Sequence, residues 1–174
     1  MGQLDGKVAI VTGSGRGIRR EVALRLARDG AAVVVNDLDD APAKETIALI
    51  EQIGGRAVAC NGDVTAKDFG ERIVGVATKQ LGGLHIIVNN AGYTWDNVIQ
   101  KMSDEQWYAI MDVHVTAPFR ILRAFAPYLR EQFEAESKRG ERIVRKVVQI
   151  SSTSGVSGNA ARSTIRPRKQ RSPA

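Results

Sequence analysis

The chain has 174 residues, of which 43% are hydrophobic, and this suits one domain with a sizeable core rather than two. The formal net charge of +6 is concentrated at one end, because residues 162–174 hold five basic side chains and no acidic one, which leaves +1 for the rest. Since the body is nearly neutral and the basic tail has no interleaved aromatic residues, we expect no nucleic-acid partner.

Cysteine use and hydropathy indicate a soluble, cytoplasmic protein. Cys60 is the only cysteine, so no internal disulfide can form, and no cysteine or histidine cluster has the spacing of a zinc site. We therefore expect a reducing compartment and no metal. Residues 1–12 do not resemble a charged leader, and no apolar run approaches the roughly 20 residues of a membrane helix, so we expect no membrane partner.

Five short apolar runs alternate with segments of helical periodicity. The expected strands are residues 7–13, 31–37, 56–63, 84–92 and 145–152. The expected helices are residues 18–30, 41–53, 66–80 and 104–135, of which the last is one long or broken helix. This alternation predicts an α/β fold, with a doubly wound parallel sheet and helices on both faces. The charged stretch 131–142 is interpreted as a solvated helix end and loop.

The turn TGSGRGI follows the first strand and opens the first helix, which is the context that a phosphate-binding glycine turn requires. Its glycines permit a tight turn and let the backbone approach a pyrophosphate at the positive end of the helix dipole. The alternative is a plain strand-to-helix loop. The cofactor-binding residues expected here are Gly13, Ser14, Gly15, Arg16, Gly17 and Ile18.

Asp37 ends the second strand, 24 residues after Gly13. A carboxylate at this position can accept hydrogen bonds from the adenosine ribose hydroxyls and would repel a 2′-phosphate, which favours NAD. Arg16 favours NADP instead, because a guanidinium in the turn could pair with that phosphate. The cofactor is therefore expected to be NAD or NADP, with NAD preferred.

Four motifs occur in the order typical of one family: TGSGRGI, NGDV at 61–64, NNAG at 89–92 and ISSTSGVSGN at 150–159. With these motifs the chain resembles the short-chain dehydrogenase/reductase family from about residue 4 to residue 160. The resemblance implies a Rossmann-type fold and hydride transfer between NAD(P) and a carbonyl or alcohol substrate. It also implies that Ser152 binds the reacting oxygen and that further residues bind the cofactor, namely Asp63, Val64, Asn90, Ala91 and Gly92.

His114 falls where many members of this family carry a catalytic asparagine, and some relatives have histidine there. Together with VVVND at 33–37, this position is similar to the hydroxyacyl-CoA dehydrogenases of multifunctional β-oxidation enzymes. The resemblance thus implies a relay role for His114 and an acyl thioester substrate. The alternative for a lone helical histidine is a hydrogen-bonded structural residue.

Two departures from the family pattern are visible. Arg19 replaces a glycine of the turn, which puts cofactor affinity in doubt. The family's catalytic tyrosine is expected 13 residues after Ser152, with a lysine four residues later; these positions hold Ile165 and Lys169, and Pro167 interrupts the expected helix. We therefore expect little or no dehydrogenase turnover, and a non-catalytic NAD(P)-binding module is the alternative function.

A frameshift near residue 160 would explain the missing tyrosine. Permissible codons for residues 162–174, read one base earlier, spell Gln-His-Tyr-Ser-Ala-Ala-Lys, which contains the family's Tyr-x-x-x-Lys. We therefore expect an incomplete dinucleotide-binding domain at 1–160, truncated after the fifth strand, and an out-of-frame, disordered basic tail at 161–174. Family members pair through the helix at 104–135 and the one after it, so we do not expect the family's homo-oligomer.

Overall fold

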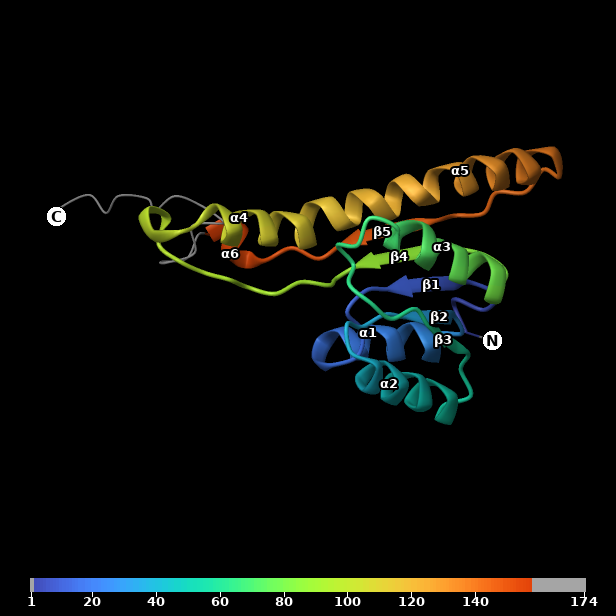
Figure 1. Cartoon of the computed structure of the whole chain (residues 1–174). Coiled ribbons are helices and arrows are strands. Elements are labelled where there is room, and N and C mark those ends of the chain that lie inside the picture. Colours follow the sequence, from blue (N-terminus) through green and yellow to red (C-terminus); the bar gives the residue numbers. More distant parts are fainter. Residues whose placement is uncertain (1, 158–174) are drawn as a thin grey trace.

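The computed structural model describes residues 2–157, which form one parallel five-stranded sheet flanked by helices (Figure 1). The strand order is β3-β2-β1-β4-β5, and every neighbouring pair is parallel. The strands are β1 (Val8–Val11), β2 (Ala32–Val35), β3 (Ala57–Ala59), β4 (Ile86–Asn89) and β5 (Lys146–Gln149). The predicted α/β, doubly wound architecture is confirmed, and β5 is the last strand within the described residues.

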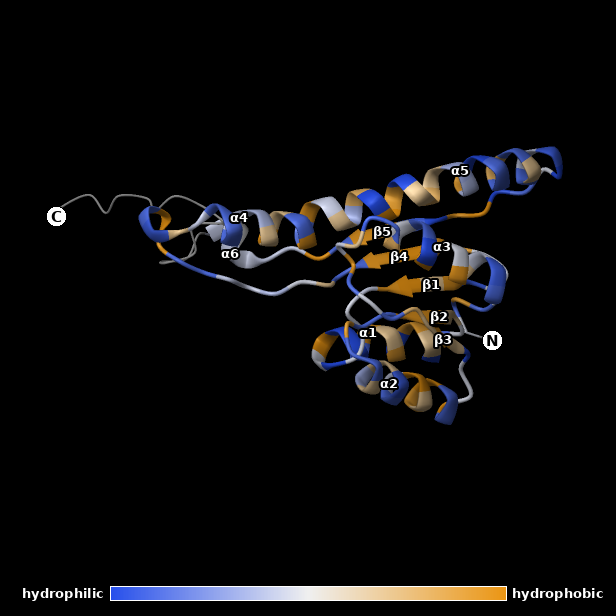
Figure 2. Ribbon diagram, viewed as in Figure 1, coloured by the Kyte–Doolittle hydropathy of each residue, from blue (hydrophilic) through white to orange (hydrophobic). Residues whose placement is uncertain are grey.

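Helices cover the sheet on both sides (Figure 1). Helices α1 (Gly17–Arg28) and α2 (Asp40–Gln52) lie on one face, and α3 (Phe69–Gln80) and α5 (Ala117–Lys138) lie on the other. Alternate strand residues face opposite layers: Ile10 packs in the α3 and α5 core, whereas Val11 packs in the α1 and α2 core. Because both faces of the central strands are covered, these strands are apolar (Figure 2) except for Asn89, the last residue of β4.

The segment predicted as one long or broken helix is broken. It consists of α4 (Asp104–Met111), a π-helical turn η2 (Asp112–Thr116) and α5. Two shorter helices, η1 (Ile99–Lys101) and α6 (Thr153–Ser157), complete the described elements. A π-helical turn inserts one extra residue per turn and is often found at functional sites, and this one contains His114.

Residues 131–142 form an exposed or half-buried helix end and loop, as expected, except for Glu136 near the end of α5. This carboxylate is only 3% exposed and pairs with Arg145, which precedes β5, at 2.5 Å. The hydrogen bond from Arg145 holds the pKa of Glu136 below its ordinary value. The charge pattern did not reveal this ion pair, which ties the end of α5 to the start of β5.

Within residues 2–157, strand β5 forms one edge of the sheet and carries exposed apolar side chains. Val147 and Val148 are 45% and 41% exposed, and β5 pairs with β4 alone among the described strands. The predicted boundary between residues 1–160 and the tail at 161–174 lies outside the described residues, and so do Ile165 and Lys169.

No helix within residues 2–157 is long and apolar enough to cross a membrane. Cys60, the only cysteine of the chain, is a free thiol buried in the α3 and α5 core. Burial raises the pKa of this thiol above its ordinary value. A buried thiol that stays protonated is a poor nucleophile, so its role in this fold is packing.

His85 makes the stability of the sheet dependent on pH. Its Nδ1 accepts a hydrogen bond from the Val8 amide at 3.0 Å, and burial, followed by the charges of Lys7 and Arg145, lowers the pKa of His85 below 6.5. The unfolded chain therefore takes up the proton first as the pH falls, so the free energy of unfolding should decrease below about pH 6.5. Urea denaturation at neutral and mildly acidic pH measures this loss.

The matched variant is His85→Asn, whose side-chain oxygen can accept the same hydrogen bond without titrating in this range. We expect it to lose less stability than the parent chain between neutral and mildly acidic pH. Equal losses in both chains would show that His85 does not carry the pH dependence.

Candidate functional site

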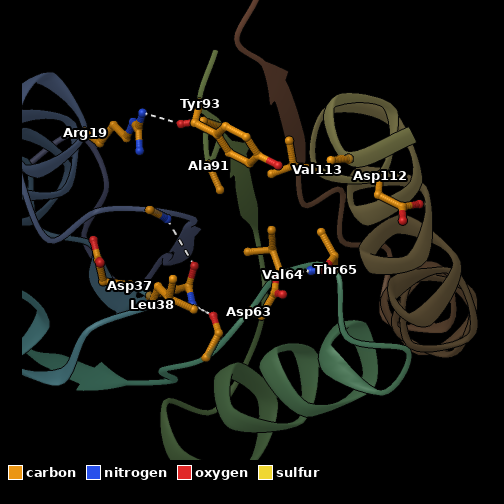
Figure 3. Close-up of a pocket in the computed structure, with 15 residues that line it drawn as sticks. Arg19, Asp37, Leu38, Asp63, Val64, Thr65, Ala91, Tyr93, Asp112 and Val113 are labelled. Atoms are coloured by element: carbon orange, nitrogen blue, oxygen red, sulfur yellow. Dashed lines mark hydrogen bonds between the residues drawn. The ribbon is translucent and has the colours of Figure 1, made fainter. Parts of the chain in front are cut away.

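A cavity of about 470 Å³ opens at the carboxyl ends of the strands (Figure 3). It lies at the point where the strand order reverses, because β1 has β2 on one side and β4 on the other. Open α/β sheets bind ligands in this crevice. Six residues predicted to bind the cofactor line the cavity: Gly13, Asp37, Asp63, Val64, Ala91 and Gly92.

The glycine turn has the backbone shape that the sequence predicted. Gly13 and Gly17 have backbone φ angles of +65° and +58°, which L residues with a side chain rarely adopt. Gly15 is needed for space, because a Cβ there would lie 2.5 Å from the Asp37 carboxylate and 2.7 Å from Pro42. Arg16, the residue before α1, makes no side-chain capping hydrogen bond, so the start of this helix can receive an anion.

Asp37 is fixed against the glycine turn. Its carboxylate accepts hydrogen bonds from the Gly15 amide at 3.0 Å and the Asp39 amide at 3.3 Å. The guanidinium of Arg16 pairs with Asp39 at 3.2 Å, and both partners are exposed. Asp37, which favours a ribose, and Arg16, which could pair with a 2′-phosphate, are therefore neighbours. Arg16 is already ion-paired with Asp39.

Asn36, which the sequence interpretation overlooked, joins the ends of three strands. Its side-chain oxygen accepts a hydrogen bond from the Gly13 amide at 3.0 Å, and its side-chain nitrogen donates to the carbonyls of Cys60 and Gly62. The residue is only 1% exposed. The sequence feature that could have identified Asn36 is a polar residue at the end of an apolar strand, directly before Asp37.

Thr12, also overlooked, fixes the end of β4. Its hydroxyl oxygen accepts hydrogen bonds from the amides of Asn90 and Ala91, both at 3.0 Å, and the residue is 2% exposed. The side-chain nitrogen of Asn90 is buried without a hydrogen-bond partner, and both side-chain polar atoms of Asn89 are in the same state. Asn90, which was predicted to bind the cofactor, is not among the residues that line the cavity, and neither is Asn89.

Asp63 and Val64 form the opposite wall. The Asp63 carboxylate accepts a hydrogen bond from the Thr65 amide at 2.8 Å, which shapes the turn, and Val64 presents a buried apolar side chain. Apolar side chains near the crevice are unusually exposed: Ile18 in the glycine turn is 82% exposed and Leu38 on the cavity wall is 71% exposed. A flat aromatic base bound here would cover such surface.

Of the remaining predicted residues, Ser14 is a structural hydrogen-bond donor, since its hydroxyl bonds to the Val11 carbonyl at 2.8 Å inside the core. His114 bonds through Nε2 to the Tyr93 carbonyl at 3.0 Å and packs against Gly92. Ser152 is exposed, and its hydroxyl accepts a hydrogen bond from the Ser154 amide at 3.2 Å. Within residues 2–157 no hydrogen bond joins Ser152 to His114, and neither lines the cavity.

These residues fit the adenosine part of a dinucleotide. The start of α1 has no side-chain cap and can receive a pyrophosphate, and Asp37 offers a carboxylate for a ribose. Arg19 is the exception, since its side chain lies in the crevice and donates to the Gly92 carbonyl at 2.7 Å. In the part of the chain that the structure describes, no group of three or more His, Cys, Asp or Glu side chains could hold a metal ion.

The fold, the glycine turn and the acid after β2 together define a nucleotide-binding protein of the Rossmann type. The family model described as short chain dehydrogenase matches residues 7–164, and the chain belongs to this family. A short-chain type dehydrogenase/reductase of Mycobacterium tuberculosis is 40% identical over 162 residues, which are 88% of this chain and 53% of that protein.

Two further similarities agree. The hydroxyacyl-CoA dehydrogenase ChsB1 of M. tuberculosis is also 40% identical, over 89% of this chain and 50% of its own length. A short chain dehydrogenase from Mycobacterium avium superposes with a TM-score of 0.85 at 34% identity, covering 94% of this chain and 58% of that one. The chain thus spans about half the length of these two M. tuberculosis relatives.

Proposed function

We propose that this chain binds NAD at the cavity and derives from an oxidoreductase that transfers a hydride between NAD and a carbonyl or alcohol substrate. The observation that carries the proposal is the Asp37 carboxylate, held by the Gly15 amide at the wall of the cavity. There it can accept hydrogen bonds from the ribose hydroxyls and repel a 2′-phosphate. The bound nicotinamide would supply the hydride acceptor or donor, and the chain supplies binding, orientation and charge stabilisation.

NADP is the less favoured cofactor because Arg16 already has a partner. Its guanidinium pairs with Asp39 rather than facing the cavity unpaired, and Arg16 is not among the residues that line the cavity. A xylitol dehydrogenase whose structure holds NAD⁺ superposes on this chain with a TM-score of 0.82 at 25% identity, which supports the same cofactor.

The substrate class proposed is a hydroxyacyl thioester or the corresponding ketone. Relatives at 34–40% identity include a hydroxyacyl-CoA dehydrogenase and peroxisomal multifunctional enzymes. In this chain the Ser152 hydroxyl is exposed at the carboxyl end of β5, where it could stabilise charge on a reacting carbonyl oxygen. His114 sits in the π-helical turn, with one ring nitrogen bonded to the Tyr93 carbonyl, as a positioning residue for that loop.

Catalysis is expected to be impaired, because Ile165 stands where the family carries its tyrosine acid. A general acid contributes about 10²–10⁴-fold to a rate. Ile165 and Arg19 are also the observations that favour the second candidate, a nucleotide-binding module without catalysis.

The test compares NADH binding with turnover in the same preparation, using NAD⁺ and a series of 3-hydroxyacyl thioesters and secondary alcohols. We expect saturable NADH binding together with a turnover number at least about 10²-fold below that of a family member carrying the tyrosine. Turnover equal to that relative would contradict the impairment. Absence of NADH binding to the folded chain would contradict both candidate functions.

A further inference from the structure

Arg19 reaches across the crevice in which a dinucleotide would lie (Figure 3). It is the third residue of α1, and its Nη2 donates to the Gly92 carbonyl after β4 at 2.7 Å. The same side chain covers the glycine turn, because a Cβ on Gly13 would lie 3.1 Å from Nη1 and 3.3 Å from Cδ of Arg19. One side chain therefore connects the turn after β1 with the loop after β4.

The strand order gives this bridge its significance. Asp37 follows β2, the glycine turn follows β1, Gly92 follows β4 and Ser152 follows β5, and these strands lie side by side in that order. A ligand with its adenosine at Asp37 and its reactive end at Ser152 must pass between the ends of β1 and β4. Arg19 lies across that passage.

The guanidinium can also leave this position. Within the described residues Arg19 has no acidic partner, and the Gly92 carbonyl is its one hydrogen-bond acceptor. The hydrogen bond to Gly92 therefore has to break before the side chain can leave the passage between the ends of β1 and β4.

We propose that Arg19 is a gate that makes the site selective for nucleoside diphosphates over whole dinucleotides. With Arg19 on the Gly92 carbonyl, the Asp37 side of the cavity accepts the adenosine and phosphates of ADP, whereas the nicotinamide half of NAD⁺ enters only when Arg19 swings away. Displacing one charge-assisted hydrogen bond weakens NAD⁺ binding by about tenfold or more relative to ADP. This inference rests on the proposed nucleotide-binding function and adds a specificity determinant to it.

The test is calorimetric titration of the chain with ADP and with NAD⁺, in the parent, in Arg19→Ala and in Arg25→Ala. Alanine is favourable within a helix, so both variants should fold. Arg25→Ala is the matched control, because it removes the same charge from the exposed face of the same helix, where Arg25 pairs with Asp29. The quantity compared is the ratio of the ADP and NAD⁺ affinities. Because both ligands carry a diphosphate, the effect of losing a positive charge near it cancels in this ratio to first order.

We expect Arg19→Ala to shift the ratio of affinities towards NAD⁺ by at least about tenfold, and Arg25→Ala to leave it unchanged. An unchanged ratio in Arg19→Ala, with ADP still bound, would overturn the gate and leave the proposed function standing. Failure of ADP and NAD⁺ to bind any of the three folded chains would overturn the gate and the proposed function together.

Discussion

Replacing Thr12 by valine should lower the free energy of unfolding by about 2–3 kcal/mol and abolish most of the nucleotide affinity. The hydroxyl of Thr12 accepts hydrogen bonds from the amides of Asn90 and Ala91, and valine has nearly the same shape without an acceptor. Both amides would lose their partner in a part-buried place, and each such loss costs about 1–3 kcal/mol. Urea denaturation and NADH titration of the variant measure the two effects.

Thr12→Ser is the matched control, because it keeps the hydroxyl and removes only a methyl group, worth about 0.8 kcal/mol. We expect it to bind NADH nearly as tightly as the parent chain. If Thr12→Val is as stable as the parent chain, the pair of hydrogen bonds to the loop after β4 does not account for the role of Thr12.

The second large effect is expected at Asp37. Changing Asp37 to alanine should weaken NADH binding by roughly 10- to 100-fold, because hydrogen bonds to a charged group are worth about 1.5–3 kcal/mol. The same change removes the repulsion of a 2′-phosphate, so NADPH affinity should stay constant or increase. The ratio of the two dissociation constants, measured by fluorescence titration, is the quantity to compare.

Asp39→Ala provides the comparison for Asp37→Ala. It removes a neighbouring carboxylate of the same charge and frees Arg16, which pairs with Asp39 at 3.2 Å. We expect NADPH to bind more tightly to this variant while NADH binding is nearly unchanged. An Asp37→Ala variant that keeps the parent's preference would show that the carboxylate does not choose the cofactor.

The fold and the phosphate side of the site were predictable because their signals are local. Apolar runs, helical periodicity and the glycines of one turn each depend on residues close in sequence, and the structure places the turn and Asp37 in direct contact. The rule that crossovers between parallel strands are right-handed restricts the possible topologies, but the strand order itself comes from the structure. The cofactor roles of the individual residues remain predictions.

The supports of the site were not predictable in the same way. Thr12 and Asn36 act on backbone amides and carbonyls 23 or more residues away, and polar residues at strand ends are common for ordinary reasons. Glu136 belongs to a charged stretch that reads as solvated, and its burial depends on Arg145, nine residues further on. The hydrogen bond from Arg19 to the Gly92 carbonyl joins residues that are 73 positions apart in the sequence. It can form only because β1 and β4 are adjacent in the sheet.

The most direct test of the nucleotide site is a titration of the isotope-labelled chain with NADH, followed by nuclear magnetic resonance of its backbone amides. We predict saturable shifts at Gly13, Gly15, Asp63 and Ala91, which lie in or beside the cavity, and little change along the exposed face of α5. Shifts scattered over the surface, or a folded chain whose spectrum NADH leaves unaltered, would contradict an adenosine-binding site at the carboxyl ends of β1 and β4.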